Sequence, residues 1–186
     1  MPIEKNKTGC IEVICGPMFS GKTAELLRRI SRVSYSKKKL LAFKPKADDR
    51  YSKDFIVSHD GEKINCIVED INEKILDFAN QADVFAFDEV QFYDISIIEV
   101  FNKLALMDKR VIAAGLDKDS NAEPFGPMPY LLAHADYITK LNSICIICGN
   151  IANFSYRISK EKTQILIGES EKYEARCRTC FYDYKG

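Results

Sequence analysis

Two segments near the start of the chain differ in the spacing of their hydrophobic residues. Residues 10–15 are mostly apolar and β-branched, which predicts a buried strand. Leu27, Ile30 and Val33 then recur at the spacing of one helix face, which predicts a helix over residues 24–36. A glycine-containing stretch separates the two segments. The pattern therefore predicts a strand, a tight turn and a helix in that order.

Strands and helices continue to alternate as far as residue 116. Apolar runs predict strands at 39–45, 82–87 and 110–116, and helices at 71–80 and after Ser96. Ser96 and Glu99 have the spacing of a capping box. The apolar residues that would share one face of the helix after them are Ile97, Val100, Phe101 and Leu104. Strands separated by helices indicate an α/β fold with a central, mostly parallel sheet.

Two segments interrupt this alternation. Residues 55–59 and 63–68 flank Asp60 and Gly61, which predicts a β-hairpin with an Asp-Gly turn. Residues 117–129 contain Gly126 and three prolines and are too irregular for a helix or strand. We expect this irregular segment at the carboxyl edge of the sheet, where loops usually contact ligands.

Residues 16–23 match the phosphate-binding spacing G-x-x-x-x-G-K-[ST] between the first strand and the first helix. The stretch consists of Gly16, Pro17, Met18, Phe19, Ser20, Gly21, Lys22 and Thr23. Backbone N–H groups at such a junction can surround a phosphate, Lys22 would reach the β- and γ-phosphates of ATP, and the Thr23 hydroxyl would ligate Mg²⁺. The alternative, a surface glycine turn with an incidental lysine, is disfavoured because the flanking elements also fit. The fold expected is a RecA-like P-loop domain.

Asp88 and Glu89 follow the apolar strand predicted at 82–87. A P-loop needs a carboxylate on a neighbouring strand to hold the magnesium ion or its water, and we assign Asp88 to that role. Glu89 would point to the other side of the strand end, where it could accept a proton from an attacking hydroxyl or orient a hydrolytic water. The first role belongs to a kinase and the second to an ATPase. A polar turn without function is the simpler alternative, but the P-loop makes it less attractive.

Four of the seven cysteines form two C-x-x-C pairs separated by 28 residues. The pairs are Cys145 with Cys148 and Cys177 with Cys180. Four thiolates at this spacing suit a closed, tetrahedral structural Zn²⁺ site, and Arg176 and Arg178 should lower the thiol pKa values. The composition also changes near residue 137 to short β-like pieces at 153–159 and 163–167. We therefore expect a P-loop domain at 1–141 and a small zinc-binding β domain at 142–186, whose loop between the cysteine pairs acts as a tethered lid.

Charge and composition limit the classes of partner. Lysine plus arginine equal aspartate plus glutamate at 27 each, so no global field favours nucleic acid or an anionic membrane. The one basic cluster, Arg28, Arg29, Arg32 and residues 37–39, lacks interleaved aromatic residues and is interpreted as a solvated face or a subunit contact. No signal peptide or membrane-length apolar run is present, which predicts a cytoplasmic protein. His59 and His134 are interpreted as structural or surface residues.

In combination these motifs resemble the type II thymidine kinase family of bacteria, poxviruses and animal cytosol. The resemblance spans nearly the whole chain, through residues 16–23, 48–51, 58–61, 87–92, 115–117 and 124–126 to the four cysteines. It implies transfer of the γ-phosphoryl group of ATP to the 5′-hydroxyl of thymidine, with Glu89 as proton acceptor and Asp88 near magnesium. It also assigns Asp49, Arg50 and Gln91 to the nucleotide side of the site, with Arg50 near the phosphates.

The resemblance further implies how the base is held. A segment called the lasso, tied at the zinc, covers the base and binds it mainly through backbone groups; by position it comprises Gln164, Ile165, Leu166, Ile167, Gly168 and Tyr173 here. The residues at the positions that wall the base are Met18, Phe92, Leu116 and Phe125. Two residues depart from the usual pattern: Ser120 stands where relatives often have an aromatic residue, and Glu169 replaces a second glycine. Homotetramers and inhibition by thymidine triphosphate are also implied.

The competing interpretation is a RecA-like, nucleic-acid-dependent ATPase, in which Glu89 activates water and the zinc module binds a strand. The balanced charge and the absence of aromatic residues among the basic ones argue against it. The chain also leaves little room for a strand-separating domain. We therefore expect a kinase with thymidine and ATP as substrates and no nucleic-acid partner.

Overall fold

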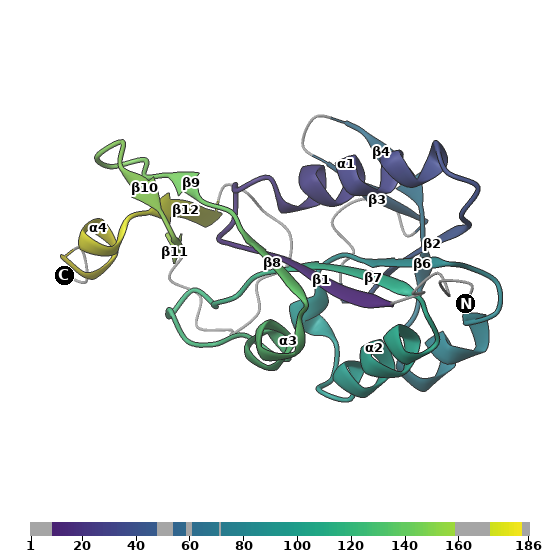
Figure 1. The fold of residues 1–186 in the computed structure, drawn as a ribbon. Helices are drawn as coiled ribbons and strands as arrows, with labels where there is room; N and C mark the ends of the chain where they lie inside the picture. The colour runs from purple at the N-terminus through teal and green to yellow at the C-terminus, as the bar shows by residue number, and fades with distance from the viewer. Residues whose placement is uncertain (1–8, 48–53, 59–60, 71, 159–171, 184–186) are drawn as a thin grey trace, which may run out of the picture.

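A six-stranded sheet forms the centre of the molecule (Figure 1). The computed structural model describes residues 9–47, 54–58, 61–70, 72–158 and 172–183. The strand order is β5-β2-β6-β7-β1-β8, and every pair in this sheet is parallel. The strands are β1 Cys10–Cys15, β2 Leu40–Lys44, β5 Ile67–Val68, β6 Val84–Phe87, β7 Arg110–Gly115 and β8 Tyr137–Lys140. The expected parallel α/β architecture is confirmed.

Helices cover both faces of the sheet (Figure 1). On one face lies α1 Lys22–Ser34, and on the other lie α2 Ile97–Leu106, α3 Met128–His134 and the 3-10 helix η1 Asn72–Phe78. Side chains alternate between these faces: Phe85 and Phe87 join the cluster under α2, while Val84 and Ala86 join the cluster under α1. Because both faces are buried, the strands read as continuous apolar runs in the sequence.

Aromatic rings fill the core between the sheet and α2. Phe87 lies 5.1 Å from Phe43 and 4.5 Å from Phe101, measured between ring centroids. All three side chains are fully buried. Since a buried aromatic ring removes about 150–250 Å² from water, this cluster is a main source of stability for the central strands that carry the site.

Several local predictions need correction. Ser96 precedes α2 but makes no side-chain cap; its hydroxyl instead accepts a hydrogen bond from Asn72 of η1 at 2.8 Å. The hairpin forms between β3 Phe55–Val57 and β4 Lys63–Asn65, but Ile67 and Val68 leave it and pair with β2. His59 and Asp60 lie outside the described residues. Helix α3 was not predicted, because Pro127 and Pro129 made its first turn look like a loop.

A small unit of short strands follows β8, and its strands pair with none of the six described above. It contains β9 Ser143–Ile144, β10 Ile151–Ala152, β11 Phe154–Arg157, β12 Tyr173–Arg176 and α4 Arg178–Asp183. We call this part of the chain the cysteine unit, and we propose the domain boundary near Asn142. The strand predicted at 163–167 lies outside the described residues. In the described part of the chain, no helix has the length and apolar character needed to cross a bilayer.

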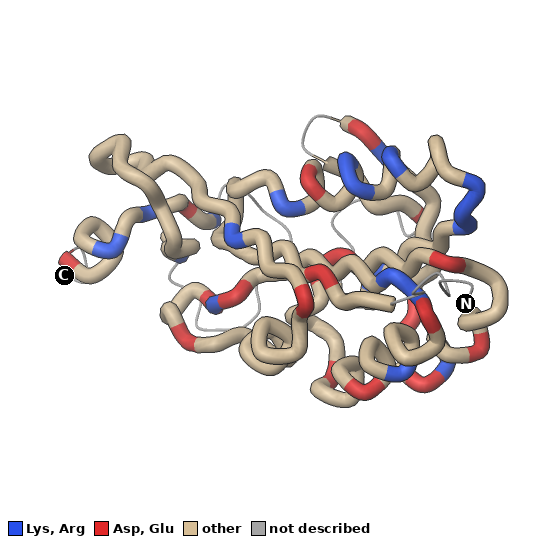
Figure 2. Tube along the Cα trace, in the orientation of Figure 1, with Lys and Arg blue, Asp and Glu red and all other residues tan. Residues whose placement is uncertain are grey.

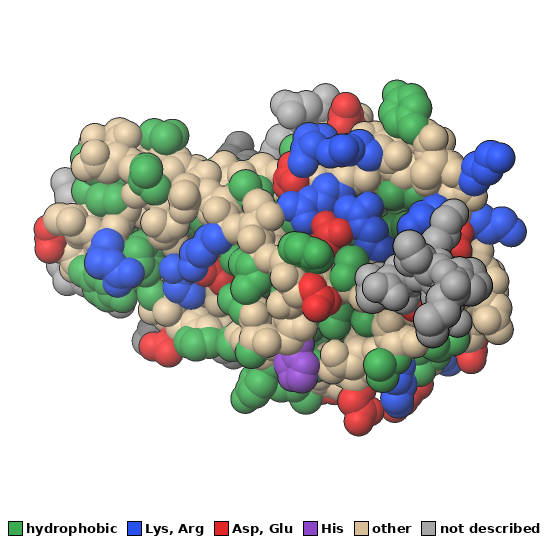
Figure 3. Space-filling model, viewed as in Figure 1, with side chains coloured by type: hydrophobic (Ala, Val, Ile, Leu, Met, Phe, Trp, Pro, Cys, Tyr) green, Lys and Arg blue, Asp and Glu red, His purple; other side chains and the backbone are tan. Residues whose placement is uncertain are grey.

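Arg29, one residue of the basic cluster, forms an ion pair with the sheet. Arg29 donates to Glu12 at 2.7 Å and to Thr139 of β8 at 2.7 Å, and Arg110 donates to Glu12 at 2.6 Å. These groups border a cavity of about 860 Å³ at the amino-terminal ends of the strands, where Lys and Arg side chains gather in Figure 3. Figure 2 shows acidic residues beside them. Much of this charge is therefore neutralised within the molecule, and the cavity lies at the sheet edge opposite the P-loop.

Glu25 on α1 should contribute stability that depends on pH. Its carboxylate accepts hydrogen bonds from Arg28 and Arg29, which lower its pKa from 4.5 to about 2. A lowered pKa in the folded state stabilises the fold above pH 4.5, and this contribution disappears as the pH falls through 2. Because the Arg28 side chain is 57% exposed, solvent screens its bond to Glu25, and we expect about 1 kcal/mol.

The measurement is denaturant unfolding of Glu25→Gln and of the unchanged chain from pH 7 to pH 2. The difference in free energy of unfolding should be constant above pH 4.5 and shrink below it. A control, Glu99→Gln, removes a carboxylate whose side chain is 79% exposed and should change stability less. A stability difference for Glu25→Gln that did not vary with pH would contradict the assignment.

Candidate active site

The P-loop joins β1 to α1 at the carboxyl edge of the sheet. Gly21 precedes the helix with φ of 79°, in the left-handed region that glycine adopts without strain. Gly16 has φ of 148°, and a Cβ there would overlap the carbonyl oxygen of Leu141. Both glycines are therefore required by the conformation. Helix α1 begins at Lys22, two residues earlier than predicted, so its first backbone N–H groups point toward the loop.

Side chains of the P-loop close it on itself. The Ser20 hydroxyl and the Lys22 ammonium both donate to the carbonyl oxygen of Pro17, each at 2.8 Å. Phe19 has φ of 63° and its side chain is one of the exposed apolar groups. The conformation gives Lys22 an acceptor within the loop, from which its flexible side chain can move to an incoming phosphate.

Asp88 meets Thr23 across the sheet edge. The Thr23 hydroxyl donates to Asp88 Oδ2 at 3.1 Å, and Asp88 is only 6% exposed. One detail of the prediction is wrong: β6 is not a neighbour of β1, because β7 lies between them. Helix α1 crosses above β7 and so brings Thr23 to the end of β6. A hydroxyl and a carboxylate oxygen at this distance fit the shared coordination sphere of one Mg²⁺ ion.

Glu89 is held in a buried position next to Asp88. Its backbone has φ of 52°, an uncommon conformation for a residue other than glycine, and it is 7% exposed. Gln91 donates from Nε2 to Glu89 Oε2, and its Oε1 accepts the backbone N–H of Leu116 at 2.9 Å. Gln91, predicted as a nucleotide contact, thus links Glu89 to the end of β7 and is itself 3% exposed.

Two of the apolar candidates for the base pocket are in contact with each other. The Phe92 and Phe125 rings lie edge to face with centroids 5.6 Å apart, and both are partly exposed. Leu116 follows β7, and Met18 lies in the P-loop. Tyr173 begins β12, where its hydroxyl accepts a hydrogen bond from Arg157 at 3.1 Å. The remaining candidates lie outside the described residues: Asp49, Arg50, Gln164, Ile165, Leu166, Ile167 and Gly168.

The four cysteines of the cysteine unit converge on one point. The sulfur atoms of Cys145, Cys148, Cys177 and Cys180 all lie within 4.8 Å of one another. Cys148 Sγ and Cys177 Sγ are 3.6 Å apart, close to the separation of about 3.8 Å between thiolates on a tetrahedral zinc ion. The donor set and its spacing therefore fit Zn²⁺. Cys10, Cys15 and Cys66 are reduced thiols outside this cluster, as expected.

The thiol pKa values in this cluster move in opposite directions. Burial raises the pKa of Cys145, but backbone N–H groups of Cys177, Cys148 and Ile147 outweigh burial and lower it to about 6. Burial and the neighbouring thiols raise the pKa of Cys180 to about 12. The arginines expected to lower these pKa values act elsewhere: Arg176 forms an ion pair with Glu174 at 2.8 Å, and Arg178 lies over the Phe154 ring. Four adjacent thiolates repel one another unless a cation is present.

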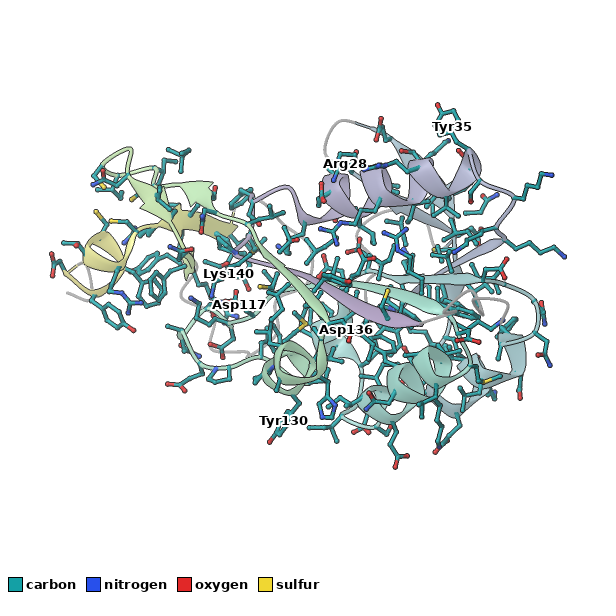
Figure 4. The ribbon with its side chains drawn as sticks, in the orientation of Figure 1. Arg28, Tyr35, Asp117, Tyr130, Asp136 and Lys140 are labelled. Carbon is teal, nitrogen blue, oxygen red and sulfur yellow. The ribbon has the colours of Figure 1, made fainter. Side chains whose placement is uncertain are left out.

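An ion pair near the P-loop, between Asp117 and Lys140, was not predicted from the sequence. Asp117, two residues after the end of β7, has a side chain only 6% exposed and accepts a hydrogen bond from Lys140 at 2.8 Å. Lys140 ends β8, and hydrogen bonding to Asp117 raises its pKa. Figure 4 shows this pair where the sheet meets the cysteine unit. The two residues lie at the ends of the strands that flank β1 on either side, and this strand order was not evident from the sequence.

Comparison with known proteins agrees with this geometry. Residues 9–181 match the model of the thymidine kinase family. The thymidine kinase of Bacteroides fragilis strain YCH46 is 47% identical over 178 residues, covering 96% of this chain and 89% of the relative. That of Rhodothermus sp. is 46% identical over 173 residues, covering 93% and 81%. The solved structure of a DNA replication initiation factor is 14% identical, with a TM-score of 0.43. The match covers 72% of this chain and 40% of that protein, and it is too weak to bear on function. The chain belongs to the thymidine kinase family.

Proposed function

We propose that this chain transfers the γ-phosphoryl group of ATP to the 5′-hydroxyl of thymidine, giving thymidine monophosphate. The observation that carries the proposal is the contact between Thr23 and Asp88, with buried Glu89 beside it. It provides a hydroxyl and a carboxylate for the metal of a nucleotide complex, and a second carboxylate for a reacting hydroxyl. Family membership supplies the substrate class.

The P-loop would position the donor. The N–H groups at the start of α1 and the Lys22 ammonium hold the phosphates, and Thr23 and Asp88 hold Mg²⁺, which neutralises charge on the transferred group. We propose that Asp49 and Arg50 complete the nucleotide side, with Arg50 near the phosphates. Gln91 acts there indirectly, by orienting Glu89.

Glu89 would accept the proton of the 5′-hydroxyl. Gln91 donates a hydrogen bond to one of its carboxylate oxygens and so holds the carboxylate in place. A carboxylate held in one rotamer transfers a proton more effectively than a mobile one, because the geometry is set before the reaction. Burial of Glu89 also limits access of water that would otherwise hydrolyse ATP.

The base would lie against apolar side chains and under a backbone clamp. Met18, Phe92, Leu116 and Phe125 are the proposed walls. The clamp is proposed for Gln164, Ile165, Leu166, Ile167, Gly168 and Tyr173. A thymine edge offers one N–H between two carbonyl oxygens, which a main chain can match without charged groups, and unpaired groups would penalise other bases.

Further proposals concern the metal, regulation, oligomeric state and location of the protein. Structural zinc would hold the two ends of the segment between the cysteine pairs. Inhibition by thymidine triphosphate, a homotetramer and a cytoplasmic location are proposed on the ground of family membership, without a nucleic-acid or membrane partner.

Gly115 offers a test of how Glu89 is oriented. A Cβ at this position would lie 2.8 Å from Gln91 Oε1 and 2.8 Å from the Met128 sulfur. We expect Gly115→Ala to displace the Gln91 amide, to cost about 1–3 kcal/mol of stability through overpacking, and to lower kcat. Unfolding curves and steady-state kinetics measure both effects. Reduced stability with unchanged kcat would show that the bond between Gln91 and Glu89 does not matter for turnover.

The proposed function is tested by measuring ATP consumption with thymidine, with single-stranded DNA and with neither, and by identifying the products. We expect ADP and thymidine monophosphate in equal amounts, and only when thymidine is present. Stimulation by DNA with release of free phosphate would instead support the nucleic-acid-dependent ATPase and give Glu89 the role of activating water.

A further inference from the structure

The cysteine unit contacts the P-loop through one buried hydroxyl. The backbone N–H of Met18 donates to Ser155 Oγ at 2.9 Å, across 137 positions of sequence. Ser155 lies on β11 and is 5% exposed. A strand of the cysteine unit is thus hydrogen-bonded to the loop proposed to hold the phosphates.

Ser155 binds the peptide unit on which the P-loop side chains rest. The carbonyl of Pro17 and the N–H of Met18 belong to the same planar peptide group. Its carbonyl oxygen accepts hydrogen bonds from Ser20 and Lys22, and its N–H donates a hydrogen bond to Ser155. Rotation of this peptide group would break all three bonds at once. The Ser155 bond alone comes from outside the loop, so it can persist when Lys22 moves to a phosphate.

Further contacts hold Ser155 in place. The preceding residue, Phe154, is 4% exposed and stacks on Phe181 at 4.7 Å, and the Lys118 ammonium lies 4.4 Å from the centroid of its ring. Behind the loop, the Leu141 N–H donates to Cys15 at 2.8 Å. The junction therefore combines apolar packing, a cation over a ring and backbone bonds, which together give β11 a defined position relative to β1.

We propose that Ser155 is a positioning residue for nucleotide binding, which fixes the Pro17–Met18 peptide group so that the P-loop is already shaped for phosphate. The proposal rests on the nucleotide site described under the proposed function. Ser155 does not itself contact nucleotide in this proposal. Its loss would let the peptide group rotate in the free enzyme, and binding would then have to restore the ordered loop.

The test is calorimetric titration of ADP into the unchanged chain and three variants. Ser155→Ala should bind ADP about 3–10-fold more weakly, the loss expected for one hydrogen bond. Ser155→Thr, which keeps the hydroxyl, should stay within about twofold of the unchanged chain. Ser143→Ala, in β9 of the same unit, is the matched control and should leave affinity unchanged. Ser155→Ala should also raise the KM for ATP more than it lowers kcat.

Zinc content and the thermal midpoint of each variant establish that the cysteine unit is folded. Equal ADP affinity of folded Ser155→Ala and the unchanged chain would overturn the proposal. Failure of Ser155→Thr to keep the affinity, or equal weakening by Ser143→Ala, would overturn it too, by showing a general packing effect. An unchanged chain that bound no ADP would instead refute the proposed nucleotide site on which this inference depends.

Discussion

Replacement of Glu89 by glutamine is expected to lower kcat by about 10²–10⁴-fold while nucleotide binding is retained. Glutamine has the same shape, and its side-chain oxygen can still accept the hydrogen bond that Gln91 donates. The geometry of the site is therefore kept and the proton acceptor is lost. Steady-state kinetics with thymidine gives kcat, and titration with ADP gives the nucleotide affinity.

A matched control for this variant is Glu99→Gln. Glu99 lies on α2, its side chain is 79% exposed, and its carboxylate is 3.6 Å from Lys103. It should keep full activity. Unchanged turnover in Glu89→Gln would show that Glu89 is not the base. A loss of ADP affinity as large as the loss of turnover would indicate that Glu89 binds the nucleotide instead.

Removal of zinc is expected to disorder the cysteine unit before the P-loop domain unfolds. Structural zinc sites supply about 10–16 kcal/mol of apparent binding free energy in small domains. The apolar packing that remains in the unit is small: Ala152 and Ala175 are the buried members of the cluster around Cys145 other than cysteines, and Phe154 stacks on Phe181 beside it. The aromatic core under α2 is separate from it. Thymidine affinity should therefore fall sharply at a chelator concentration that leaves the main unfolding transition in place.

The experiment compares thymidine titration and thermal unfolding with and without chelator, and adds Cys177→Ser as a variant without an intact ligand set. Cys10→Ser, which removes a free thiol of β1, is the control and should bind zinc and thymidine normally. If chelation removed the metal and left thymidine affinity untouched, the idea of a segment tethered at zinc would be wrong.

The central strands, α1 and α2 could be predicted because each has a local signal. The strand at Val84–Phe87 is apolar on both faces, and α2 buries the predicted residues Ile97, Val100, Phe101 and Leu104. The order of the strands has no such signal. β7 lies between the P-loop strand and β6, and Ile67 and Val68 pair with β2, because pairing depends on how crossovers pack over the whole sheet.

The residues proposed for chemistry follow sequence motifs, whereas Ser155, which we propose holds the P-loop in place, belongs to none. Thr23, Asp88 and Glu89 follow patterns that can be read within a few positions. Ser155 has no such pattern, because its partner Met18 is 137 residues away. Ser96 was misinterpreted for a related reason: its hydroxyl bonds to Asn72 on another element, so tertiary contact replaced the local cap.

The bond between Lys22 and the Pro17 carbonyl has a consequence for how the site tells its two substrates apart. An anion can displace that carbonyl, because a bond from an ammonium group to a charged oxygen is about twice as strong as one to a neutral oxygen. A nucleoside carries only neutral oxygens and gains nothing by the exchange. We therefore expect the P-loop to admit ATP and to exclude thymidine, which would keep the donor and the acceptor from exchanging places in the site.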